Sequence, residues 1–283
     1  RENDEYIIEE GRSLGTQAVS FRYLGQLQKA IEGSQKALEI SMKENDRQWE
    51  GYHLAELGSS YLDLGDLPTG THYLKKALDI AQETSDKHYE VVWAIRLGVK
   101  ELFSNNLDEA IENLKNAASL AEGNENSQFD IDFRLARAML EVRSGRLESA
   151  NNLITPALET EYGLYLPEIM ALYGIILLRQ KKIKEAAKQF KATIEKANDL
   201  LRQSPQFYSA LDVKGVASCG LALCENAKNA EYIDNAVCFY RQARSIVTAY
   251  GVIKRAMFFF DECAKADEQG ILSDVRGAVE GLK

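Results

Sequence analysis

The side chains with the most reactive or metal-binding chemistry in this sequence are four cysteines and three histidines. The cysteines are Cys219, Cys224, Cys238 and Cys263. The histidines are His53, His72 and His88. No two cysteines form a C-x-x-C pair, and the histidines, 19 and 16 residues apart, fall on different helices in the repeat described below, whereas structural zinc sites use closely spaced ligand pairs. We therefore predict reduced, buried thiols, no metal site and no cofactor.

Motifs for catalysis or nucleotide binding are also missing from the sequence. It contains no G-x-x-x-x-G-K-[ST] loop, no G-x-G-x-x-G loop and no H-E-x-x-H pair. The segment from Gly215 to Gly220 has two glycines but no lysine, and its apolar neighbours indicate close helix packing. Carboxylates are abundant, yet nothing in the sequence distinguishes a catalytic pair. We predict that the chain is not an enzyme.

Composition limits the class of partner. The 283 residues carry a net charge of −9, which disfavours nucleic acid because phosphate backbones require a basic face. No apolar run reaches the roughly 18 residues of a membrane helix, and no signal peptide is visible. Only 4 prolines occur, which favours a helical chain. We expect a cytoplasmic protein without a membrane segment.

Small residues recur along the chain at a measurable period. They are Ala30, Gly70, Ala110, Ala150, Ala186 and Ala236. The first four are 40 residues apart, and the next intervals are 36 and 50 residues. In most repeats a large apolar residue follows after four positions and an alanine after seven, which places all three on one helix face.

A turn precedes each small residue. Gly25, Gly65, Asn105, Gly145 and Lys181 stand in these turns, and glycine or asparagine there suits a left-handed helix end. A second small position lies twelve residues before the first, which predicts close crossing of two helices. Its members are Ala18, Gly58, Gly98, Ala138 and Gly174.

Polar breaks separate the repeats and carry residues typical of helix starts. They include 45–47 and 85–87, and also Ser204-Pro205, where we expect the serine to cap a helix whose first residue is the proline. Each repeat is thus a helix, a turn, a second helix and a break. We predict an all-α fold of antiparallel helix pairs: one continuous solenoid over 1–283, with about six pairs in 5–250 and capping helices in 252–283. Phe258, Phe259 and Phe260 should belong to the core of that cap.

The repeat resembles the tetratricopeptide repeat. In the best-matching repeat, Gly58, Tyr61, Gly70, Leu74 and Ala77 fall at the family's small, aromatic and alanine positions. The signature tryptophan is missing, and the period is 40 residues where about 34 is common. The resemblance implies a right-handed superhelix whose concave surface is lined by the first helix of each pair. The longer period is similar to sensor arrays of bacterial multidomain signalling NTPases (STAND-type proteins).

Counting from the repeat positions gives the side chains that should line this concave groove. They are Tyr52, Glu56, Ser59, Asp63, Arg96, Val99, Phe103, Asp132, Met139, Arg143, Ile175 and Arg179. Arginine binds carboxylates through its planar fork, so we predict a partner segment with an acidic portion over repeats 3–5. The alternative is that these arginines only pair with neighbouring helices.

The function expected from this pattern is non-catalytic binding of a protein or peptide. The resemblance suggests the sensor or regulatory region of a larger bacterial signalling protein. A free-standing adaptor or assembly scaffold is the first alternative, and an enzyme with a hidden site in the groove is the second. Self-association remains open.

Overall fold

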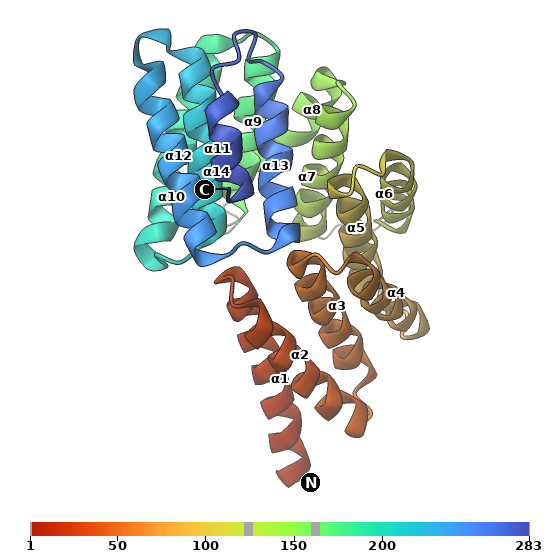
Figure 1. Ribbon diagram of the computed structural model, residues 1–283. Coiled ribbons are helices and arrows are strands. Elements are labelled where there is room, and N and C mark those ends of the chain that lie inside the picture. Colours follow the sequence, from red (N-terminus) through yellow and green to blue (C-terminus); the bar gives the residue numbers. More distant parts are fainter. Residues whose placement is uncertain (1, 122–126, 160–164, 283) are drawn as a thin grey trace. The chain divides into compact units, whose positions relative to one another are not determined.

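The computed structural model describes residues 2–121, 127–159 and 165–282. These residues form fourteen α-helices and no strand, and 85% of them are helical (Figure 1). The predicted all-α helical-repeat fold is therefore confirmed. Two compact units are distinguished, one of Arg1–Phe133 with Ala249–Gly251 and one of Arg134–Thr248 with Val252–Lys283, called unit 1 and unit 2 below. A single continuous solenoid over the whole chain stays a prediction.

Unit 1 consists of helical hairpins that follow one another along the chain. Its helices are α1 (Glu2–Tyr23), α2 (Leu27–Lys43), α3 (Arg47–Leu64), α4 (Leu67–Glu83), α5 (Lys87–Phe103) and α6 (Leu107–Ala121). Each first helix packs on the second helix of its own hairpin, and α1, α3 and α5 also contact one another in that order. The row formed by α1, α3 and α5 is called the inner face of unit 1.

Unit 2 continues with less regular hairpins. Helix α7 (Ser127–Arg143) belongs to unit 2 from Arg134 onward, and its earlier residues belong to unit 1. The others are α8 (Leu147–Ile154), α9 (Leu166–Arg179), α10 (Ile183–Gln203), α11 (Tyr208–Cys224), α12 (Asn229–Ile246), α13 (Tyr250–Ala264) and α14 (Ser273–Glu280). Short 3-10 segments, η1 (Thr155–Glu159) and η2 (Asn226–Lys228), follow α8 and α11.

The turns within the hairpins adopt the backbone conformation that the sequence predicts. The φ angles are +73° at Gly25, +102° at Gly65, +61° at Asn105, +77° at Gly145 and +61° at Lys181. The left-handed region reverses the chain within a few residues, so each second helix can pack back on the first.

The helix starts are confirmed in two places and wrong in a third. Asp46 and Asp86 cap α3 and α5, each accepting a hydrogen bond from a backbone N–H three residues later. Ser204, in contrast, does not start a helix. It ends α10 in an extended conformation, and α11 begins only at Tyr208. A residue before proline is pushed out of the helical region, and at Ser204 this effect stops the preceding helix.

Close crossing at the small positions is confirmed. A Cβ built on Gly58 would lie 2.9 Å from the carbonyl oxygen of Gly70, and one on Gly174 would lie 2.6 Å from the Phe190 ring. The same ring lies 2.2 Å from a Cβ built on Gly220. Phe258, Phe259 and Phe260 are buried, so their place in the core is also confirmed. Within the described ranges, no helix has both the length and the apolar character needed to cross a membrane.

Candidate functional site

A network of charged side chains lies at the centre of the inner face of unit 1. Glu56 of α3 is only 2% exposed, and Arg96 of α5 donates to its Oε1 at 2.7 Å and to Ser59 Oγ at 2.7 Å. From the other side, Arg22 of α1 lies 3.4 Å from Glu56 Oε2 and 3.2 Å from Asp63 Oδ2. The repeat of about 40 residues places these side chains at matching heights on three adjacent helices. We call them the charge network of unit 1.

The two arginines keep Glu56 ionised. Burial alone would raise the pKa of this carboxyl group, because a charge is poorly solvated inside the protein. The charges and hydrogen bonds of Arg96 and Arg22 outweigh burial, and the pKa lies below its usual value. The network therefore holds two positive and two negative groups at neutral pH.

Aromatic side chains extend this surface toward the start of α3 and α5. The Arg96 guanidinium lies 4.6 Å from the centre of the Trp93 ring, and Tyr89 stacks on Trp93 at 5.1 Å. Tyr52 lies 6.0 Å from Tyr89, and both are half-buried. Trp93 is 1% exposed and belongs to the core, so only Tyr52 and Tyr89 present part of their rings to a partner.

His53 lies directly beneath this surface and is fully buried. Its ring faces Gly15 of α1, where a Cβ would come within 2.2 Å of the imidazole. Burial lowers the pKa of His53 to about 4, although Glu56 and Asp46 act in the opposite direction. The ring is therefore neutral at pH 7, and it packs beside Trp49 and Tyr52.

The structure brings five of the predicted groove residues together and places others nearby. Tyr52, Glu56, Ser59 and Asp63 lie on α3, where Glu56 and Ser59 accept hydrogen bonds from Arg96 of α5 and Asp63 pairs with Arg22 of α1. Val99 and Phe103 follow on α5 and are half-buried, as is Asp132 on α7. Sequence reasoning missed three contributors, Arg22, Tyr89 and Trp93. The i, i+4 spacing of the two aromatic residues, with Arg96 three positions later, was the available signal.

The predicted groove residues of unit 2 have different surroundings. Met139 is 3% exposed and Ile175 is fully buried, so neither presents surface to a partner in this conformation. Arg143 and Arg179 both contact Glu262 of α13, at 2.7 Å and 2.5 Å. Pairing with neighbouring helices, the alternative considered for these arginines, is therefore what the structure contains. Binding of a partner at these four residues stays a prediction.

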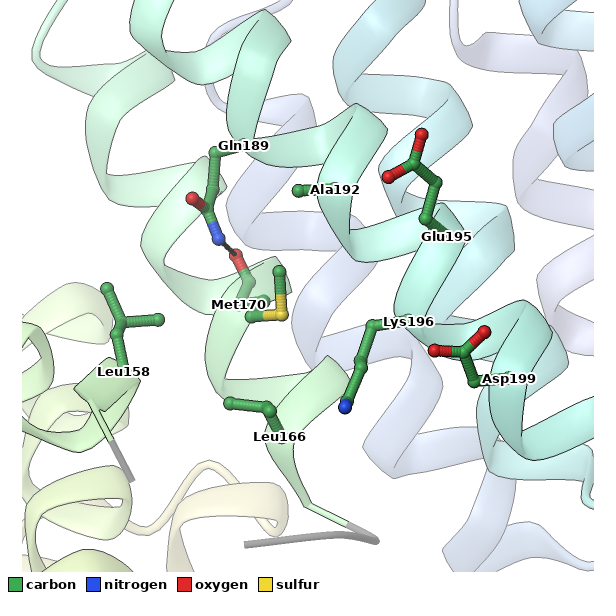
Figure 2. Close-up of a pocket in the computed structure, with 8 residues that line it drawn as sticks. All are labelled: Leu158, Leu166, Met170, Gln189, Ala192, Glu195, Lys196 and Asp199. Carbon is green, nitrogen blue, oxygen red and sulfur yellow. Dashed lines mark hydrogen bonds between the residues drawn. The ribbon is translucent and has the colours of Figure 1, made fainter. Parts of the chain in front are cut away.

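A separate groove of about 420 Å³ lies in unit 2, between η1, α9 and α10 (Figure 2). Three apolar side chains form one side, Leu158, Leu166 and Met170. Residues of α10 form the other: Gln189, Ala192, Glu195, Lys196 and Asp199. Gln189 donates to the carbonyl of Met170 at 3.4 Å. None of these residues was predicted to line a binding site.

The reactive side chains do not form a catalytic centre among the described residues. All four cysteines are free thiols, and burial raises the pKa of Cys219 and Cys263 far above the usual range and that of Cys224 to about 11. Thiols with such pKa values are poor nucleophiles. His53, His72 and His88 lie on α3, α4 and α5, as predicted, and the described part of the chain has no group of three or more potential metal ligands.

Comparison with known proteins identifies the fold class. No protein-family model matches the sequence, and no curated protein matches it. Among solved structures, the Rap conjugation gene regulator of plasmid pLS20, in complex with the Phr* peptide, matches with a TM-score of 0.62 and 14% identity. The match covers 98% of this chain and 76% of the regulator. At this identity the likeness shows the fold alone, a helical-repeat solenoid of the tetratricopeptide-like kind.

A second structure, yeast Tom70, matches with a TM-score of 0.41 and 16% identity. That match covers 94% of this chain and 67% of Tom70, and we infer nothing from this looser likeness.

Proposed function

We propose that the chain is a non-catalytic module that binds a protein or peptide segment along the inner face of unit 1. The observation that carries the proposal is the charge network, flanked by the half-buried aromatic side chains Tyr52 and Tyr89. Polar, charged and aromatic groups on one face suit recognition of a peptide with mixed chemistry. The solved Rap regulator, which shares the fold, is in complex with a peptide, which supports this assignment.

An acidic portion of the partner would bind first at Arg96. The side chain of Arg96 is 30% exposed, whereas that of Glu56 beneath it is 3% exposed. A partner carboxylate can therefore approach the guanidinium from the solvent side while Glu56 keeps its hydrogen bond. Within unit 2, an acidic segment at Arg143 and Arg179, which the sequence also predicts, would have to replace Glu262, and this costs an existing ion pair at each arginine.

Binding can be tested with selected peptides. Random 12-residue peptides displayed on phage are selected on the full chain, and synthetic versions of the selected peptides are titrated by fluorescence anisotropy. We expect Asp and Glu to be enriched, and Arg96→Gln to weaken binding at least tenfold. Lys76→Gln is the matched control, because Lys76 is an exposed cation on α4 of the same unit. Equal affinities of the two variants would refute the assignment of the site.

The biological context that we propose is a cytoplasmic regulatory region of a larger bacterial signalling protein. The repeat pattern supports it, and a free-standing adaptor or scaffold is the alternative. The sequence of the whole gene distinguishes them, since a flanking effector or NTPase domain favours the regulatory region. An enzyme with a hidden site remains the third candidate. Raised thiol pKa values at Cys219, Cys224 and Cys263 speak against cysteine catalysis in the described residues.

A further inference from the structure

Helix α13 makes contacts that the regular repeat does not explain. Ion pairs between different helices of unit 1 join residues 34 to 41 positions apart, such as Arg22 with Glu56 and with Asp63. Glu262 of α13 instead bonds Arg179 of α9, 83 positions away, and Arg255 bonds Glu168, 87 positions away. Figure 1 draws α13 in front of α9. Charged side chains therefore join helix α13 to both ends of α9, which is far from it in the sequence.

The residues that make these contacts lie on one side of α13. Arg255, Phe258 and Glu262 have the spacing i, i+3, i+7, which is one stripe of a helix. Arg255 pairs with Glu168 near the start of α9, and Glu262 pairs with Arg179 at its end. Between them, Phe258 lies under the Arg143 guanidinium at 4.7 Å. Opposite charges at the two ends fix the direction of α13 as parallel to α9.

The acidic end of this stripe is desolvated. Glu262 is fully buried against its cationic neighbours Arg143 and Arg179. Helices that bind in grooves use the same i, i+3, i+7 pattern of anchoring side chains. The charges, spacing and direction of the α13 stripe thus match the charged groups of α7 and α9, as those of a bound helix would.

We propose that α13 is an internal ligand of unit 2 and that its place can be taken by an amphipathic partner helix of the same chemistry. Such a helix carries a basic residue, an aromatic residue three positions later and an acidic residue seven positions later. Its acid would bind Arg143 and Arg179, and its basic residue would bind Glu168. This inference concerns unit 2 and is independent of the site proposed in unit 1.

Release of α13 can be measured through Cys263, which is fully buried next to Glu262. The full chain is exposed to N-ethylmaleimide, and the modified cysteines are quantified by mass spectrometry. Circular dichroism of each variant under the same conditions serves as the control for unfolding of the unit. We expect Glu262→Gln to raise the Cys263 rate at least tenfold over that of the original chain while the helical signal is unchanged. Glu268→Gln, which removes only an exposed pair with Lys181, should leave the rate unchanged.

Replacement of α13 is tested with a fluorescent peptide of residues 250–266 that carries serine at position 263. It should bind the Glu262→Gln chain at least tenfold more tightly than the original chain, and a peptide with Glu262→Gln should bind at least tenfold more weakly. Phe258→Leu is a second variant for the same readouts if the first does not fold. A Cys263 rate equal to that of the original chain in both variants, or equal binding of the two peptides, would overturn the proposal.

Discussion

Replacing Glu56 with glutamine tests how strongly the charge network holds the inner face of unit 1. The substitution keeps the shape of the side chain and removes its charge. Arg96 and Arg22 then lose a carboxylate that lies 2.7 Å and 3.4 Å from their guanidinium nitrogens. Removing one partner of a buried ion pair costs about 3–5 kcal/mol, because the remaining charge is left uncompensated.

The structure lowers the expected loss for two reasons. Arg22 keeps Asp63 at 3.2 Å, and Arg96 keeps Ser59 at 2.7 Å and is partly solvated. We therefore expect Glu56→Gln to lower the free energy of unfolding by about 2–3 kcal/mol at pH 7. Because the pKa of Glu56 is lowered in the folded state, this contribution is present above the unfolded-state pKa of about 4.3. It disappears as the pH falls through the lower pKa of the folded state.

Urea unfolding followed by tryptophan fluorescence is the appropriate assay. Both tryptophans, Trp49 and Trp93, lie in unit 1, so their emission reports on that unit alone. Glu83→Gln is the control, because Glu83 pairs with Arg47 in the same unit but is 57% exposed. Glu83→Gln should lower the free energy of unfolding by no more than about 1 kcal/mol. If Glu56→Gln is as stable as the original chain, the network does not hold the three helices together.

Three further changes have expected outcomes. Gly220→Ala should lower the free energy of unfolding by about 2 kcal/mol, because the added Cβ would meet Phe190 at 2.2 Å. Adding Phe190→Leu to this variant should restore most of that stability, as measured by thermal melts followed by circular dichroism. Lys181→Gly should raise the unfolding free energy by about 0.5–1 kcal/mol in urea unfolding, since Lys181 has a φ of +61°. His53 has a pKa of about 4 when folded and about 6.5 when unfolded, so unfolded chains take up the proton first as the pH falls. The free energy of unfolding of unit 1 should therefore fall by about 2 kcal/mol between pH 7 and pH 5, and His53→Leu should reduce that fall. If the variant shows the same pH dependence as the original chain, His53 is not its source.

The repeat made the hairpins predictable, because their determinants are local. Gly65 and Asn105 specify turns, Asp46 and Asp86 cap helices, and Gly58 marks a crossing, each within one or two turns of the chain. Ser204-Pro205 carried an ambiguous signal, since the residue before a proline can precede a helix or end one. The Ser-Pro pair alone does not distinguish these two outcomes.

The sites were less predictable, because they depend on contacts between distant segments. Spacing placed Glu56 and Arg96 on neighbouring first helices, one repeat apart. Nothing in the spacing showed that Arg143 and Arg179 would share Glu262, since α13 is not part of the regular repeat. An array aligned by its period predicts which side chains face inward, and it does not predict which segment of the chain covers them.

Mapping where a bound peptide lies tests the central claim most directly. A peptide selected on the full chain is synthesised with a benzophenone side chain at one end, crosslinked by light and located by mass spectrometry. The account predicts crosslinks to the inner face of unit 1, at α3 and α5 near Tyr52, Val99 and Phe103. Crosslinks confined to the outer helices α2, α4 and α6, or to unit 2, would contradict it.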